Sequence, residues 1–195
     1  LLINARKQNT MTLNWTWKVY VFDLNKDLSL RSTTQLEPDD SEPNDGFGTA
    51  LSVSSDGLTA IIGAPYKGTY TAGPNFGAAY IFSRPDEYIM FSQKKLSVVS
   101  SNVDLFGDAV AISGDGQRAL IGAPMEANGL TPKVGAGYVY ERSGDRWTLQ
   151  SKIRGEGTGF GSLFGQAVAL DKKGEVAIIG APRILPPIGA LGTPL

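Results

Sequence analysis

The chain has 195 residues, 42% of them hydrophobic, with 18 basic against 19 acidic side chains. This near-zero net charge argues against nucleic-acid binding, which needs a concentrated basic surface. Histidine and cysteine are both absent, which excludes disulfides, imidazole and thiol catalysis, and the usual ligands of zinc, copper and iron. No apolar run is long enough to cross a membrane as a helix. We therefore expect a globular protein with no cofactor, no membrane span and no nucleic-acid partner.

The first part of the chain carries few structural signals. Residues 1–16 show no sustained periodicity, and we interpret them as a loosely placed entry segment. Asn14 begins Asn-Trp-Thr, an acceptor sequence for N-glycosylation in a eukaryotic secretory pathway. Alternatively, the two neighbouring tryptophans lie on one face of a strand and pack on a core. Residues 17–22 (WKVYVF) predict a strand, and a second strand is expected across residues 27–36.

An acidic segment follows these strands. Residues 37–46 (EPDDSEPNDG) concentrate carboxylates within one short loop. Calcium prefers several converging oxygen ligands, so the segment is a candidate calcium site. The alternative is a solvated connection rich in turn-forming residues. The calcium candidates are Asp39, Asp40, Glu42 and Asp45.

One motif occurs three times, at residues 47–65, 106–124 and 164–182. Each copy opens with Phe-Gly and closes with Gly-Ala-Pro, and its opening and closing glycines are 15 residues apart. Successive copies start 59 and 58 residues further along the chain. A fixed period of this kind predicts a repeat protein in which each unit is one supersecondary block. The motif residues are Phe47, Gly48, Gly63 and Pro65; Phe106, Gly107, Gly122 and Pro124; and Phe164, Gly165, Gly180 and Pro182.

Each unit is predicted to be a four-stranded antiparallel meander. In the second copy, strands are expected at residues 109–113, 118–121, 136–140 and 147–153. Alanines crowd the hairpin after each Phe-Gly pair, and small side chains suit innermost strands that converge on a central channel. The prediction is an all-β fold of about three β-propeller blades, belonging to a larger propeller or assembly. We expect the Phe-Gly glycine to let neighbouring blades approach closely and the phenylalanine to fill the gap between their sheets.

The repeat period divides the chain into five parts. Residues 1–16 are the entry segment, and residues 17–46 are the outer strands of a partial first blade. Two complete blades follow at residues 47–105 and 106–163. Residues 164–195 form a partial blade with a proline-rich tail.

This pattern resembles the FG-GAP repeat of integrin α-subunit propellers and of their bacterial and protist relatives. The resemblance implies a propeller blade in a secreted or cell-surface protein that acts in adhesion or protein binding. Many such repeats carry a calcium loop in the hairpin turn, but the second copy places only Asp115 among Ala111, Ser113 and Ala119 at the ligand positions. The chain is therefore more similar to calcium-free bacterial or protist repeats than to integrins. Asp56 and Asp115 are expected to serve as turn residues before glycine.

Loops on the propeller rim are the expected binding elements. The loops that follow Gly-Ala-Pro in the first two copies should emerge on one rim, and loops on rigid scaffolds often carry recognition. The candidates are Tyr66, Tyr70, Asn75, Met125 and Asn128. The alternative is that these loops are simple connectors of variable length.

The sequence thus indicates a non-enzymatic, extracellular or cell-surface module for protein or glycan binding, adhesion or structural assembly. Its partners would be a protein, a glycan, or further copies or blades of a larger assembly. The alternative is the propeller part of a secreted hydrolase that acts on glycans through carboxylates located outside this chain. The pairs Asp86-Glu87 and Glu141/Asp145 lie in expected outer turns, where charges are ordinarily solvated. We therefore expect no catalytic residue here.

Overall fold

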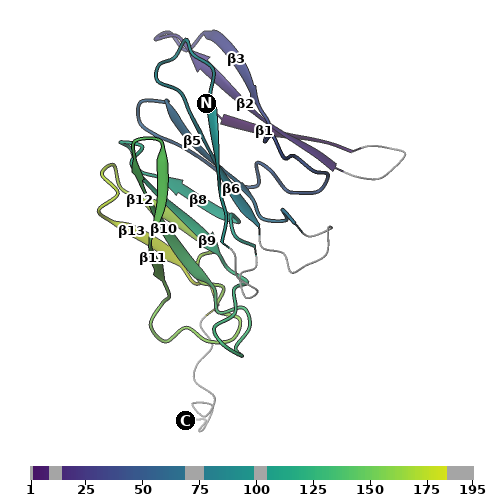
Figure 1. Cartoon of the computed structure of the whole chain (residues 1–195), viewed down its shortest axis with the longest axis vertical. Helices are drawn as coiled ribbons and strands as arrows, with labels where there is room; N and C mark the ends of the chain where they lie inside the picture. Colours follow the sequence, from purple (N-terminus) through teal and green to yellow (C-terminus); the bar gives the residue numbers. More distant parts are fainter. Residues whose placement is uncertain (1, 9–14, 69–76, 99–104, 184–195) are drawn as a thin grey trace, which may run out of the picture.

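A computed structural model describes residues 2–8, 15–68, 77–98 and 105–183 (Figure 1). These residues form strands and turns only, so they contain no helix that could cross a membrane. Their thirteen strands lie in four antiparallel sheets, which follow one another through the molecule as the blades of a β-propeller. The all-β propeller fold is thus confirmed.

The sheets are called blades 1 to 4 in chain order, and within each one the strands neighbour each other in sequence order. Blade 1 contains β1 (Leu2–Gln8), β2 (Trp15–Leu24) and β3 (Leu30–Leu36). Blade 2 contains β4 (Leu51–Val53), β5 (Thr59–Ala64), β6 (Ala78–Ser83) and β7 (Ser92–Leu96). Blade 3 contains β8 (Ala109–Ile112), β9 (Arg118–Ala123), β10 (Ala136–Ser143) and β11 (Arg146–Ile153). Blade 4 contains β12 (Ala167–Leu170) and β13 (Ala177–Gly180) among the described residues.

The strands predicted for blade 3 agree with the structure to within a few residues, but the interpretation of the entry segment is wrong. Leu2–Gln8 forms β1, which pairs antiparallel with β2 so that Leu2 lies opposite Val21. The segment lacks hydrophobic alternation, yet a ladder needs only backbone donors and acceptors on a neighbouring strand. Blade 1 therefore begins well before residue 17.

Glycines make the junctions between blades. A Cβ atom on Gly63 would lie 1.9 Å from the carbonyl oxygen of Gly107, and one on Gly122 would lie 1.9 Å from that of Gly165. The Gly-Ala-Pro glycine of one blade therefore touches the Phe-Gly glycine of the next blade. This confirms the predicted close approach, which any larger residue would prevent.

Phenylalanines fill the space between the sheets. Phe47 is 1% exposed and packs edge-to-face on Tyr80 with ring centroids 5.7 Å apart, while Phe106 is 0% exposed and packs on Tyr138 at 5.3 Å. Phe47 belongs to the core between blades 1 and 2, and Phe106 to the core between blades 2 and 3. The predicted role of these phenylalanines is confirmed, since aromatic rings bury a large apolar area.

The innermost hairpins stack turn on turn. The Ser55 N–H donates to the Gly114 carbonyl at 2.8 Å, and the Asp115 N–H donates to the Lys172 carbonyl at 3.0 Å. Asp56 and Asp115 each accept a hydrogen bond from a serine hydroxyl two residues earlier at 2.5 Å. Both carboxylates therefore serve the turn itself, as predicted.

Candidate functional site

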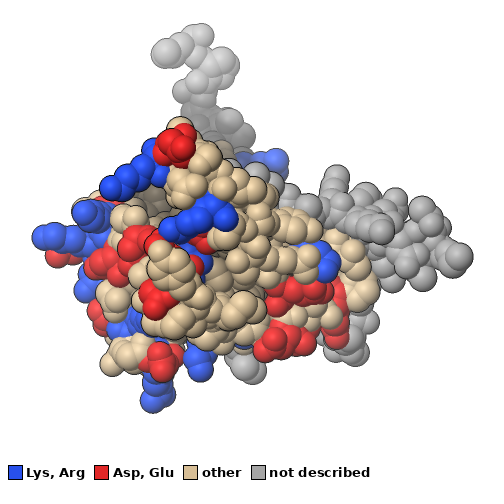
Figure 2. Space-filling view, turned by 90° about the horizontal axis from the view of Figure 1, so that it is seen from above, with Lys and Arg blue, Asp and Glu red and all other residues tan. Residues whose placement is uncertain are grey.

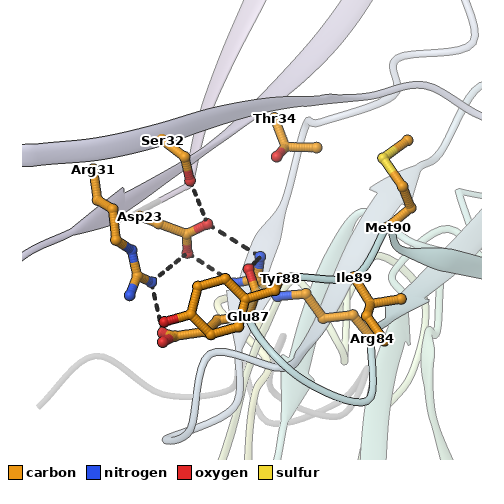
Figure 3. A pocket seen from close by; sticks show the side chains of 9 residues that line it. All are labelled: Asp23, Arg31, Ser32, Thr34, Arg84, Glu87, Tyr88, Ile89 and Met90. Atoms are coloured by element: carbon orange, nitrogen blue, oxygen red, sulfur yellow. Dashed lines mark hydrogen bonds and ion pairs between the residues drawn. The ribbon is translucent and has the colours of Figure 1, made fainter.

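A hollow of about 300 Å³ is lined by residues of blades 1 and 2. The β2–β3 turn and the β6–β7 loop lie at the same rim of the molecule (Figure 1). We call this hollow the apolar hollow. Blade 1 and the loop of residues 84–91 both line it (Figure 3). Its lining residues are Asp23, Arg31, Ser32, Thr34, Arg84, Glu87, Tyr88, Ile89 and Met90.

A buried ion pair forms the floor between the two blades. Both Nη atoms of Arg84 donate to the carboxylate of Asp23, at 2.7 and 3.1 Å. The guanidinium also lies over the ring of Phe91, 4.6 Å from its centroid. The hydrogen bond from Arg84 lowers the pKa of Asp23 and outweighs the effect of burial. This fork-to-fork pair fixes the β6–β7 loop against blade 1.

A second ion pair crosses the same boundary closer to solvent. Arg31 of β3 bonds Glu87 at 2.6 Å, and this contact, together with a hydrogen bond from Tyr88, lowers the pKa of Glu87. The neighbouring Asp86 accepts a hydrogen bond from the Tyr88 N–H at 2.8 Å. Both carboxylates of this predicted pair therefore have defined partners in the loop or in blade 1.

Three consecutive apolar side chains stand beside this floor. Tyr88 is 85% exposed, Ile89 50% and Met90 80%. Ile89 and Met90 lie on the opposite side of the hollow from Arg31 (Figure 3). Leu28 and Leu30 of the β2–β3 hairpin are also exposed. Contiguous exposed apolar side chains of this kind mark interaction sites.

A second hollow of about 510 Å³ shares the wall formed by the two ion pairs. We call it the acidic hollow, because Asp56 and Asp86 join Asp23 and Glu87 in its lining. The two arginines of the shared wall are its basic lining residues. From above, acidic and basic side chains lie intermixed over much of the visible surface, which is not a field of one sign (Figure 2).

The family model for the FG-GAP repeat matches residues 31–82, from β3 through most of β6. The chain therefore contains an FG-GAP repeat in this segment. A search of curated proteins finds no match to it. The matched segment contains the first Phe-Gly to Gly-Ala-Pro stretch, and it ends shortly before the loop that lines both hollows.

The rim residues predicted from the FG-GAP pattern lie at the other end of the blades. Tyr66 is 41% exposed, Met125 is half-buried and Asn128 is exposed. Because β6 begins at this rim and ends at the β6–β7 loop, the predicted loops do not contribute to either hollow. The remaining candidates, Tyr70 and Asn75, lie outside the described residues, as does Asn14.

The acidic segment before the first FG-GAP motif is exposed over most of its length, but its last carboxylate is buried. Asp45 is 4% exposed, and the Lys67 ammonium lies 3.0 Å from its carboxylate and 3.6 Å from that of Glu42. Lys67 also donates to the backbone carbonyl of Asp40. Burial raises the pKa of Asp45, against the hydrogen bond from Lys67. A lysine thus supplies the positive charge that a calcium ion would bring.

Two further groups bind Asp40 of this segment. Its carboxylate accepts hydrogen bonds from the Tyr80 hydroxyl at 2.7 Å and from Lys95 at 2.6 Å. Burial favours the neutral acid, but these bonds prevail and lower the pKa of Asp40. Asp39 is exposed, and its N–H approaches the Gln93 side chain at 3.4 Å. The segment is therefore fastened to blade 2.

At the equivalent position of blade 3 the charges are reversed: a buried carboxylate lies among basic side chains. Glu126 is 0% exposed and accepts bonds from Arg154 at 2.5 Å, from the Tyr138 hydroxyl at 2.5 Å, and from Lys152. Lys67 and Glu126 are equivalent, because their carbonyls accept the N–H of Gly77 and Gly135 respectively. Burial and the bond to Glu126 raise the pKa of Tyr138. Neither ionic centre was predicted.

Proposed function

We propose that this FG-GAP protein is a non-enzymatic binding module of a secreted or cell-surface protein, and that it binds a protein partner at the apolar hollow. The observation that carries this proposal is the row of three exposed apolar side chains, Tyr88, Ile89 and Met90, beside a hollow between two blades. Partner binding would remove these side chains from water, at a gain of about 25 cal/mol per Å² of apolar surface.

The loop that presents these side chains is held rigidly. Two ion pairs, Arg84 with Asp23 and Arg31 with Glu87, tie it to blade 1. A partner therefore meets a loop whose backbone is already tied down, so less conformational freedom is lost on binding than in a free loop. Blade 3 connects the equivalent strands through a short turn at Gly144, so the longer apolar loop is not required to build a blade.

The same contacts support a non-catalytic role. A general acid needs a raised pKa, whereas the pKa values of Asp23 and Glu87 are both lowered by their arginine partners. The extracellular location is supported by the family, since FG-GAP repeats commonly occur in extracellular proteins.

Peptide selection on the full chain tests the binding site. Peptides from a displayed random library, selected on the wild-type protein, should bind about tenfold or more weakly to Met90→Asp, because a charge replaces an apolar contact. Leu130→Asp is the matched control, since Leu130 is 103% exposed on the opposite rim. The substitution at Met90, which is 80% exposed, should leave the free energy of unfolding within about 0.5 kcal/mol of wild type.

The opposite pattern of binding losses would place the binding site elsewhere on the molecule. Binding that is lost in Leu130→Asp or Tyr66→Ala and retained in Met90→Asp would assign recognition to the opposite rim. Selection of no binding peptide, combined with binding of a glycan array that carboxylate substitutions abolish, would contradict the protein-binding proposal altogether.

A further inference from the structure

The apolar and acidic hollows share one wall, and this wall is electrically neutral. Asp23 is paired with Arg84, and Glu87 is paired with Arg31. An anionic ligand would have to break one of these pairs to reach a guanidinium group. The wall therefore separates the hollows without attracting negative charge.

The acidic hollow contains two carboxylates without a cationic partner. Within the described ranges, neither Asp56 nor Asp86 forms an ion pair, and their hydrogen bonds are local. Asp56 accepts the Ser54 hydroxyl and the Leu58 N–H on the same oxygen, Oδ1. Asp86 likewise uses Oδ1, for the Tyr88 N–H. Each residue keeps a second carboxylate oxygen for another donor.

The size and chemistry of the two hollows select the class of ligand. A volume of about 300 Å³ is at the lower end for small-molecule sites, so the apolar hollow suits one or two side chains. Two uncompensated carboxylates beside it attract a cation and repel anionic lipid headgroups and nucleic acid. Charge complementarity therefore favours a basic segment of a protein.

We propose that the two hollows together bind a short partner segment in which a lysine or arginine stands beside a large apolar residue. The apolar side chain packs against Ile89 and Met90, and the cation lies against Asp56 and Asp86 on the other side of the ion-pair wall. This inference rests on the proposed function, because it specifies the partner chemistry of the same site.

The test compares peptides with and without the cation. Library-selected peptides should be enriched in lysine or arginine next to an apolar residue. Replacing this lysine or arginine by glutamine should weaken binding roughly threefold to tenfold. The double variant D56N/D86N should weaken the basic peptide by a similar factor and leave the glutamine peptide unchanged. The difference should shrink at high salt, because exposed charges are screened.

Asp115→Asn is the matched control, since Asp115 makes the same turn in blade 3 as Asp56 makes in blade 2. Peptides that bind wild type and D56N/D86N equally, but fail to bind Met90→Asp, would overturn this inference and leave the proposed function standing. Absence of any peptide that prefers wild type over Met90→Asp would overturn both.

Discussion

Blades 2 and 3 share four strands, two junction glycines and a buried phenylalanine, but their ionic centres have opposite signs. Lys67 lies among the carboxylates of Asp45, Glu42 and Asp40, whereas Glu126 lies between the cations of Lys152 and Arg154. The glycine contacts between blades thus recur in the two repeats, while the side-chain contacts diverge. A repeat must keep the positions where backbones touch and can change the others.

The outer turns show the same contrast. Arg84 and Arg142 occupy equivalent positions, since their N–H groups donate to the carbonyls of Leu58 and Gln117. Arg84 reaches across the junction to Asp23, but Arg142 bonds Gly144 of its own turn at 2.8 Å. Among the described residues, an ion pair therefore supports the outer loop at the first junction, while the equivalent arginine of blade 3 bonds within its own turn.

The largest effect should come from a position that the two blades share. We expect Gly63→Ala, and equally Gly122→Ala, to lower the free energy of unfolding by about 3 kcal/mol or more. The reason is that the new methyl group would overlap a backbone carbonyl of the next blade. Urea unfolding of the full chain measures this. Gly159→Ala is the control, since nothing lies within 4 Å of its Cβ position. Equal stability of the Gly63 and Gly159 variants would mean that the blades do not approach this closely.

An intermediate effect should come from the position where the blades differ. Glu126→Lys places a third cation beside Lys152 and Arg154, and Lys67→Glu adds a carboxylate to the opposite centre. We expect each substitution to lower the free energy of unfolding by about 2–3 kcal/mol, since most of the surrounding charged side chains are partly exposed and can relax. Denaturation of the single and double variants should give additive losses, because the two centres have separate partners. Rescue in the double variant would show that the centres interact directly.

The smallest effect should appear at Asp108, where blade 2 has Thr49 and blade 4 has Gln166. Burial raises the pKa of Asp108, so the charged form is disfavoured in the folded state. The stabilising contribution of this group is complete below its unfolded pKa of about 4 and is lost as pH rises through the folded value. At pH 7 the free energy of unfolding of Asp108→Asn should therefore be up to about 1 kcal/mol higher than that of wild type, so the variant is more stable. The two proteins should converge at pH 3, and a gap that persists there would contradict this cause.

The sequence predicted the junctions well, because a backbone contact requires glycine at a fixed spacing. It could not predict the apolar hollow, whose central ion pair joins Asp23 and Arg84 across 61 positions of the chain. One local signal was present, since the loop after β6 is longer than the turn after β10 and contains Tyr88, Ile89 and Met90. Lys67 carried no such signal, because its role depends on an acidic segment that precedes it by more than twenty residues.

The exchange of charge between Lys67 and Glu126 also bears on how the chain reaches its fold. Neighbouring repeats with similar strands are prone to misassembly, in which one hairpin takes the place of another. A blade 2 segment in the blade 3 position would bring Lys67 against Lys152 and Arg154, and the converse error would bring Glu126 against Asp40 and Asp45. Both errors would bury like charges together, so they cost free energy relative to the correct order of the blades. The charges of these two residues thus help to specify the position of each repeat among repeats of similar structure.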